Sequence, residues 1–427
     1  MEYSPYVTWF EKTATKRPVF DSLKEDITCD ICIVGGAFTG ISAALYGAEK
    51  KQDVVLIEAS KIGYGCTGRG GGLIESGLNT TLDDLSDFLG RMTAHDFWNS
   101  TIDARDSIVS TIEKYKIDCG YSKGLTKISR NDFKAVESAS NATYFTNHFE
   151  NEYIDFLTAD AVKSVFNMPS AKFGLRYANA GSFNPLSYLF GAAKAAVENN
   201  ARIYEDSPVV SISEGDEIIV RTENGTVKCK SLIVCGNAYM GEEHSPEKTR
   251  TVSTDYFQIV TKPIDAGILD AVSPSRETVI GRGTLGSYIQ FTEDNRIIFG
   301  GPDYLSLKDK EKYAEVKLKK LMKLLPELKG HIEADYLWTG PVGVPMNYVP
   351  IFSKKYTNHY IAHGFNGHGV SVSCFGGHVL VDAVLGEDKI FDIYARIRPV
   401  NLPKIAHHAI AKLTLIYYRL SSKPFNG

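Results

Sequence analysis

The amino-acid sequence predicts an α/β protein with two domains, one built on a mostly parallel sheet and the other on an antiparallel sheet. A strand–turn–helix–strand pattern over residues 30–58 begins the first domain, and further strand and helix signals at residues 185–235 and 360–385 complete it. Short alternating strands between residues 255 and 340 predict the antiparallel sheet. At 427 residues the chain is too long for one small hydrophobic core, which also favours two domains.

The segment over residues 30–72 carries the strongest functional signal. An apolar run at residues 31–34 stops at Gly35, a short turn leads into a helical pattern that continues to Glu49, and a second apolar run ends on Glu58. This order of strand, glycine turn, helix, strand and acid is that of the Rossmann-like unit that binds the ADP part of a dinucleotide.

Each position in that unit has a physical role. Gly35 permits the tight turn after the first strand, and Gly40 allows the helix to lie close to the sheet. The helix N-terminus offers free N–H groups to a pyrophosphate, and Glu58 can accept hydrogen bonds from a ribose. Ala37 stands where a glycine is usual, and its methyl group is either tolerated or loosens binding. The residues predicted to bind the ADP half are Gly35, Gly36, Ala37, Phe38, Thr39, Gly40, Glu58 and Ala59.

A second group of glycines, within residues 63–72, indicates which dinucleotide is bound. A flavoprotein needs a flexible, amide-rich loop at this place because the chain must run beside the ribityl chain and the isoalloxazine edge, whereas an NAD domain does not. The alternative interpretation is a flexible surface linker. The sequence therefore predicts FAD, contacted by Gly65, Cys66, Thr67, Gly68, Arg69, Gly70, Gly71 and Gly72.

Hydrophobic periodicity predicts the remaining elements. Asn224-Gly225 is a strong hairpin signal between two of the strands. The helices are expected at residues 82–118, 133–165, 185–198, 310–327 and 370–385. The strands are expected at residues 118–128, 203–213, 217–228, 231–235, 256–261, 287–292, 296–299 and 360–362.

These elements predict a discontinuous Rossmann-like FAD-binding domain over residues 28–80, 181–250 and 341–390, and an α+β substrate domain over residues 81–180 and 251–340. Residues 1–27 are expected to form an arm that wraps around the body. Residues 391–427 form a basic helical tail, which either docks on its own domain or contacts an anionic membrane surface.

Composition excludes some classes of function. The formal net charge of −4 argues against a nucleic-acid-binding protein, which would carry a basic excess. Seven cysteines without framework spacing predict reduced thiols in a cytoplasmic protein. We also find no signal peptide, and no apolar run of the ~18 residues that a membrane-spanning helix requires.

Several stretches of the sequence are not required by the fold as such, so their joint presence is specific. They include LIVCGNAYMG, TEDNRIIFGG, YLWTGPVG and GFNGHGV, in addition to ITCDICIVGGAFTG and VVLIEASKIGYGCTGRGGG. Together they resemble the D-amino-acid-oxidase-like FAD-dependent oxidoreductases, over roughly residues 15–390. Within that family the chain is most similar to the gamma-glutamylputrescine oxidase subgroup.

The resemblance implies further contacts with the flavin. The loop over residues 364–370 would close over the pyrimidine end of the ring, where a helix N-terminus stabilises negative charge. His368 would either add a donor there or cap the helix. FAD is expected to be non-covalent, because residues 338–351, where some relatives attach it, contain no cysteine. The additional cofactor residues are Val209 (near the adenine), Gly236, Asn237, Gly340, Gly364, Asn366, Gly367, His368, Gly369 and Val370.

The implied reaction is oxidation of an amine C–N bond. The substrate passes a hydride to flavin N5, the resulting imine hydrolyses to an aldehyde and an amine, and dioxygen reoxidises the flavin with release of H2O2. Aromatic walls suit a cationic amine and exclude water. The candidate catalytic residues are His368, Tyr288, Tyr256 and Trp338, with Gln258 and Gln290 in the same strands. Each of the aromatic residues could equally be an ordinary core residue.

Charged and metal-binding candidates are fewer. Arg282 and Arg296 could hold a substrate carboxylate, although Arg296 also fits a solvated strand end. No metal is expected. Cys29 and Cys32 lie three positions apart in a strand, so their side chains should face opposite sides of the sheet. His363 flanks the late glycine turn without acidic or thiol partners.

Three functions are compatible with these observations. The first is an amine oxidase for a gamma-glutamylputrescine-like or N-alkyl amino-acid substrate. The second is a dehydrogenase that passes electrons to a quinone or carrier, in which the basic tail contacts a membrane. The third is a non-catalytic flavin-binding scaffold, suggested by Ala37 and by Gly70, which stands where the subgroup commonly has asparagine.

Overall fold

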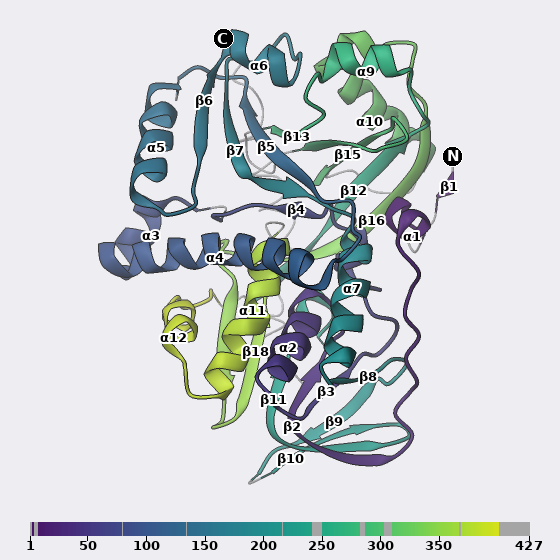
Figure 1. Ribbon diagram of the computed structural model, residues 1–427, viewed down its shortest axis with the longest axis vertical. Helices are drawn as coiled ribbons and strands as arrows, with labels where there is room; N and C mark the ends of the chain where they lie inside the picture. The colour runs from purple at the N-terminus through teal and green to yellow at the C-terminus, as the bar shows by residue number, and fades with distance from the viewer. Residues whose placement is uncertain are drawn as a thin grey trace.

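The computed structural model describes residues 2–3, 7–78, 80–133, 135–215, 217–240, 250–281, 287–302, 310–366 and 369–400. Two sheets organise these residues, and Figure 1 shows them in the lower and upper halves of the molecule. The fold is therefore the predicted mixed α/β architecture, with a Rossmann-like parallel sheet and a separate, largely antiparallel sheet.

The Rossmann-like sheet has eight strands, and its central strands are parallel. A three-stranded antiparallel extension, β9–β10–β11, includes the hairpin predicted at Asn224-Gly225. The strand order is β17 (Ile351–Lys355), β18 (His359–His363), β11 (Thr226–Val234), β2 (Asp26–Val34), β3 (Val54–Ile57) and β8 (Arg202–Tyr204). Strand β10 (Ile218–Thr222) pairs with β11, and β9 (Val209–Ser213) pairs with β10.

Helices α2 (Phe38–Glu49), α7 (Pro185–Glu198) and α11 (Gly369–Val384) pack together over this sheet in one apolar core (Figure 1). The approach of α11 to α2 is close: a Cβ at Gly377 would lie 2.5 Å from both Thr39 O and Ala43 N. This contact joins the first turns of α2 to the middle of α11. Helices α3 (Leu82–Leu89), α4 (Arg91–Tyr115) and α12 (Lys389–Ala395) complete this layer.

The second sheet has ten strands and encloses its own apolar core with the helices around it (Figure 1). Its order is β1 (Glu2–Tyr3), β16 (Ala334–Pro345), β12 (Thr251–Thr261), β15 (Ile297–Pro302), β14 (Tyr288–Phe291), β13 (Thr278–Gly281), β5 (Ser122–Ser129), β7 (Phe173–Ser182) and β4 (Leu73–Ile74), with β6 (Ile154–Thr158) paired to β7. The helices are α5 (Ala135–His148), α6 (Ala159–Val165), α9 (Ala266–Val272) and α10 (Lys310–Leu324).

The N-terminal segment lies against the glycine-rich loop that follows β3. Helix α1 (Trp9–Thr13) begins after Thr8, whose hydroxyl donates to Gly68 O at 3.1 Å. Arg17 Nη1 donates to Ile62 O at 2.8 Å, and Leu23 N donates to Ser207 Oγ at 2.9 Å. This segment therefore supports the loop from outside.

Some of the predicted elements are wrong in detail. A continuous helical region over residues 133–165 was expected, but β6 interrupts it between α5 and α6. The local pattern of residues 154–158 does not distinguish strand from helix, and this stretch becomes a strand because it pairs with β7. Residues 203–213 form two strands, β8 and β9, separated by a turn at Asp206 with φ of 48°.

The expectation that Cys29 and Cys32 face opposite sides is also wrong. The N–H groups of Asp30 and Ile31 both donate to Asp53 O, at 2.9 and 3.1 Å, which marks a β-bulge between the two cysteines. The extra residue returns the second side chain to the face of the first. All seven cysteines of the chain remain free thiols. Three of them lie in one apolar cluster on that face: Cys29, Cys32 and Cys229.

The predicted domain boundaries stay a prediction. The boundary expected at residues 340 and 341 falls within β16, and β4, expected in the FAD-binding domain, pairs with β7 in the ten-stranded sheet.

Within the described ranges, no single helix has the length and apolar character to cross a membrane. The pair α11 and α12 reaches that length only together, with a bend of 114°.

Candidate active site

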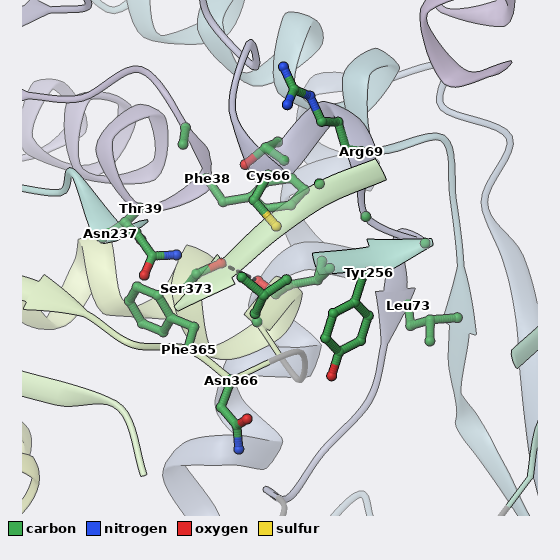
Figure 2. A pocket seen from close by; sticks show the side chains of 18 of the residues that line it. Phe38, Thr39, Cys66, Arg69, Leu73, Asn237, Tyr256, Phe365, Asn366 and Ser373 are labelled. Carbon is green, nitrogen blue, oxygen red and sulfur yellow. Dashed lines mark hydrogen bonds between the residues drawn. The ribbon is translucent and has the colours of Figure 1, made fainter. Parts of the chain in front are cut away.

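A cavity lies between the two sheets, where α2, the glycine-rich loop, β12, β14 and α11 meet. It holds about 1210 Å³ of space free of atoms, part of it open to solvent. Figure 2 shows the Cys66 thiol and the Tyr256 ring directed into it, whereas the Arg69 guanidinium points away. The lining residues are Ala37, Phe38, Thr39, Cys66, Thr67, Arg69, Gly70, Gly71, Leu73, Glu75, Cys235, Asn237, Tyr256, Gln258, Ile280, Tyr288, Gly340, Val342, Phe365, Asn366, Gly369, Val370 and Ser373.

Two helix N-termini open into this cavity. Ala37 is the N-cap of α2 and has no side-chain cap, while Gly369 is the first residue of α11. Neither helix has an acidic residue in its first turn, so the positive end of each dipole is uncompensated by its own helix. This arrangement fits an anionic ligand that reaches from one helix to the other.

The glycines of the first turn are required by sterics. Gly35 has φ of 113°, a conformation that side chains of L-residues rarely adopt, and a Cβ there would lie 3.0 Å from Cys235 O. A Cβ at Gly40 would lie 1.8 Å from Gly35 O, so α2 can pack against β2 only if residue 40 is glycine. The structure therefore has the tight turn expected at Gly35 and the close approach of helix to sheet expected at Gly40.

Glu58 follows β3 and turns its carboxylate toward the same glycine turn. Its Oε2 accepts from Gly36 N at 2.6 Å, and its Oε1 accepts from Ser60 N at 2.9 Å. Burial raises the pKa of Glu58, and these two backbone donors oppose that rise. The carboxylate is therefore positioned at the turn, outside the cavity lining, where the ADP half is predicted to lie.

The loop after β3 is held by donors from the second sheet. Trp338 Nε1 donates to Arg69 O at 3.1 Å, and Gln258 Nε2 donates to the same oxygen. Gln290 Nε2 donates to Gly71 O at 2.6 Å. Trp338 is fully buried and does not line the cavity. Its position is thus behind the loop, where it supports the backbone of Arg69.

Strand register places one row of side chains on the cavity face. Lys127 of β5 pairs with Ile280, Ile280 with Tyr288, and the row continues through Gly300 and Gln258 to Trp338. Residues paired in this way project from the same face of a sheet. A Cβ at Gly300 would overlap the Tyr288 ring, so this glycine makes room for the ring beside the cavity.

Two polar atoms of this row are buried without a hydrogen-bond partner, Gln258 Oε1 and the Tyr288 hydroxyl. Both residues line the cavity, and a buried polar atom without a partner is the kind of group that a bound ligand can satisfy. Burial also raises the pKa of Tyr288 well above its usual value, so the hydroxyl stays protonated and can donate.

The thiols that line the cavity are not nucleophiles. Burial raises the pKa of Cys66 to about 11, and it also raises the pKa of Cys235. Both therefore remain protonated near neutral pH. In the part of the chain that the structure describes, no group of three or more His, Cys, Asp or Glu residues is arranged to bind a metal ion.

The late glycine turn is joined to the segment after β11. Asn237 has φ of 44°, and its Oδ1 accepts from Gly364 N at 3.0 Å. Asn366 has φ of 51° and donates its N–H to Gly343 O at 3.3 Å. The Asn237 side chain therefore connects two segments that are about 130 residues apart in sequence.

The structure brings most of the predicted site residues to this cavity and leaves others beside it. His368 and Gly367 lie outside the described residues, as do Arg282 and the basic tail from residue 401. Arg296 is held by Asp294 and Asp335, away from the lining. The predicted residues that do not line the cavity are Gly35, Gly36, Gly40, Glu58, Ala59, Gly65, Gly68, Gly72, Val209, Gly236, Gly364 and Trp338.

Sequence reasoning missed several lining residues. Leu73 and Glu75 directly follow the glycine loop, so their proximity to it was an available signal. Ile280 and Val342 come from strands whose side-chain direction depends on register, which the sequence does not reveal. Cys235, Phe365 and Ser373 are neighbours of predicted residues and complete the set.

The Tyr288 hydroxyl leads to a testable prediction. Tyr288→Phe should leave the stability of the flavin-free protein unchanged or raise it by about 1 kcal/mol, because a buried hydroxyl without a partner is removed. The turnover of a ligand that occupies the cavity should fall about tenfold, because we expect the hydroxyl to donate a hydrogen bond to that ligand. Thermal unfolding and kcat/KM measure the two effects.

Tyr360→Phe is the matched control, because its buried hydroxyl donates to Ala383 O at 3.1 Å. That variant should lose stability and keep its turnover per folded molecule. A Tyr288→Phe variant that loses stability as Tyr360→Phe does would show that the hydroxyl has a partner within the protein.

Comparison with known proteins identifies the family. The profile of the FAD dependent oxidoreductase (DAO) family matches residues 30–383. Gamma-glutamylputrescine oxidoreductase of Escherichia coli (strain K12) is 32% identical over 397 residues, covering 93% of this chain and 92% of that protein. L-proline dehydrogenase from P. horikoshii superposes with a TM-score of 0.68 at 20% identity, covering 86% and 96% of the two chains. Glycine oxidase from Bacillus cereus has a TM-score of 0.67 at 19% identity, covering 88% and 100%.

The chain therefore belongs to the DAO family of FAD-dependent oxidoreductases. It is therefore an FAD-dependent oxidoreductase. The residues present fit this cofactor, because two acid-free helix N-termini, the glycine turn and unpartnered polar atoms converge on the cavity.

Proposed function

We propose that this enzyme oxidises the C–N bond of a primary or secondary amine, with a gamma-glutamylputrescine-like or N-alkyl amino-acid substrate. FAD supplies the acceptor for the hydride that leaves the α-carbon of the substrate. The imine that forms takes up water and releases an aldehyde, together with ammonia from a primary amine or a smaller amine from a secondary amine. Dioxygen is the proposed final acceptor and is reduced to H2O2. The 32% identity to gamma-glutamylputrescine oxidoreductase over 93% of the chain supports this proposal.

The residues that line the cavity suit the binding and deprotonation of an amine. The charged residues among the described lining are Arg69 and Glu75, and the Arg69 guanidinium points away from the cavity (Figure 2). Tyr256 and Tyr288 supply an aromatic surface for a cationic amine. A largely apolar cavity lowers the pKa of an amine through desolvation, so the substrate can lose its ammonium proton without a dedicated base.

The proposed roles of the predicted site residues follow from this arrangement. Ala37 and the first turn of α2 would hold the pyrophosphate, Glu58 the ribose, and residues 65–72 the flavin. Gln258 and Tyr288 would present their unpartnered atoms to flavin or substrate. Trp338 would position the loop through Arg69 O. Because all seven cysteines are free thiols, we also propose a reducing, cytoplasmic location.

Anaerobic reduction of the purified flavoprotein tests this function. The absorbance of oxidised flavin should decrease on addition of gamma-glutamylputrescine, and less rapidly with sarcosine, glycine or D-amino acids. Under air, each mole of amine consumed should yield one mole of peroxide. Loss of flavin absorbance with slow peroxide formation and rapid reduction of an added quinone would assign a dehydrogenase. Unchanged absorbance with every amine would contradict the catalytic proposal and favour a scaffold.

A further inference from the structure

Glu75 on the cavity wall forms an ion pair with Lys127, and neither residue has a role in the proposed transfer of hydride to the flavin. Glu75 follows β4, lines the cavity and is 6% exposed. Its Oε2 lies 2.7 Å from Lys127 Nζ, and the Lys127 side chain is 18% exposed. The Lys127 ammonium also lies 4.7 Å from the centre of the Tyr177 ring. A carboxylate and an ammonium group are thus held together beside the cavity, by residues of the ten-stranded sheet and its edge strand.

Lys127 is not itself among the lining residues, but strand register places it on the sheet face that borders the cavity. Lys127 pairs with Ile280, which lines the cavity, and Ile280 pairs with Tyr288. The three side chains therefore leave the same face of the sheet. Two strand spacings, roughly 10 Å, separate the backbone of Lys127 from that of Tyr288 beside the glycine loop. The ion pair therefore lies about two strand spacings along the sheet from the point where Tyr288 contacts the glycine loop.

The charge of the pair restricts what it can bind. Lys127 neutralises Glu75, so the wall presents a dipole and not a net charge. A lone ammonium group that approached Glu75 would be repelled by Lys127, and a lone carboxylate would be repelled by Glu75. A zwitterion meets both groups with opposite charges and leaves the net charge of the wall unchanged.

We propose that the Glu75–Lys127 pair binds a zwitterionic α-amino-acid group at the far end of the substrate, with Glu75 receiving the ammonium and Lys127 the carboxylate. This inference rests on the proposed amine oxidation, and it defines the substrate class as amines that carry such a group remote from the oxidised nitrogen. In a gamma-glutamyl derivative of putrescine, about nine bonds separate the reacting nitrogen from the α-carbon, roughly 11 Å when extended. That length matches the separation of Tyr288 and Lys127 along the sheet.

Four acylated putrescines, which differ only in the charged groups of the acyl part, measure the contribution of each charge to binding. The γ-glutamyl amide carries both charges, the glutaryl amide lacks the α-ammonium, the 4-aminobutyryl amide lacks the α-carboxylate, and the butyryl amide lacks both. Rates of anaerobic flavin reduction give kcat/KM for each in the holoenzyme. Calorimetry under anaerobic conditions with the corresponding butylamides, which lack the terminal amine of putrescine, gives affinities for the acyl end of each ligand.

In the unaltered enzyme the γ-glutamyl butylamide should bind about 10- to 100-fold more tightly than either singly charged analogue. Glu75→Gln should weaken the ligands that carry an ammonium by about tenfold or more, tighten the glutaryl ligand because Glu75 no longer repels its carboxylate, and leave the butyryl ligand within about twofold. Lys127→Met should weaken the ligands that carry a carboxylate by a similar factor. Glu277→Gln is the matched control, because Glu277 is also buried and paired, with Arg176 at 2.5 Å, but does not line the cavity.

The outcomes separate this inference from the proposed function. Selective binding without flavin reduction by any amide would support the amino-acid site and contradict the proposed oxidation. Flavin reduction by all four amides at similar kcat/KM, with equal affinities of the butylamides, would contradict the amino-acid site and leave the oxidation standing. Absence of binding of every butylamide, or equal losses in Glu75→Gln and Glu277→Gln, would also overturn the inference.

Discussion

Gly40→Ala should abolish flavin binding and destabilise the protein by about 3 kcal/mol or more. The added Cβ would lie 1.8 Å from Gly35 O, an atom of the backbone that cannot rotate away as a flexible side chain can. Helix α2 would have to move from β2, and its N-terminus would leave the place predicted for the pyrophosphate. The flavin absorbance of the purified protein and its thermal unfolding measure both effects.

Gly70→Ala is the matched control for this prediction. Gly70 lies in the second glycine group and lines the cavity, but a Cβ there would meet only Cys66 O, at an ordinary 3.5 Å. This variant should keep its stability. If Gly40→Ala purified with a full complement of flavin, the close packing of α2 on β2 would not be needed for cofactor binding.

Glu58→Ala should reduce the affinity for FAD by about 10- to 100-fold, because the charged hydrogen-bond acceptor proposed for the ribose is lost. The same side chain also accepts from Gly36 N and Ser60 N, so some loss of stability should accompany the loss of affinity. Titration of the flavin-free protein with FAD, followed by fluorescence, gives the dissociation constant. Unfolding of the flavin-free protein gives the structural contribution separately.

Glu58→Gln distinguishes the two roles of this acid. A glutamine keeps one acceptor oxygen, so only one of the two backbone donors loses its partner. FAD affinity should therefore decrease in the order Glu, Gln, Ala. If both variants lost stability but bound FAD with unchanged affinity, Glu58 would be a support of the glycine turn and not a ribose ligand.

Local sequence signals predicted the fold class and the nucleotide-binding half well. The helix predicted at residues 185–198 has those bounds in the structure, and the hairpin at Asn224-Gly225 joins β10 to β11. These features depend on neighbouring residues: an N-cap at Asn184, apolar spacing along one helix face, and glycine where a turn requires it. Interactions of this kind are encoded within a few positions of the chain.

The errors in the predicted elements arose where a strand pairs with a segment that is distant in the sequence. Strand β6 replaced part of a predicted helix because β7 provides its hydrogen-bond partners. The bulge at residues 30–31 reversed the expected facing of Cys32 because Asp53 O accepts from two successive N–H groups. In both cases the deciding partner lies at least 15 residues away, beyond the range of a local hydrophobic pattern.

The sequence by itself determined the Rossmann-like unit, the flavin and the family, because glycine sterics, helix N-termini and an acid at the end of a strand act within one short segment. The tertiary structure decided which side chains share the sheet face that borders the cavity. The row from Lys127 through Ile280 and Tyr288 to Trp338 joins strands that are distant in the chain, and it exists only once their register is set. A shift of one residue in any strand would turn its side chain away from the cavity, and that register is specified by burial of the opposite face in the core.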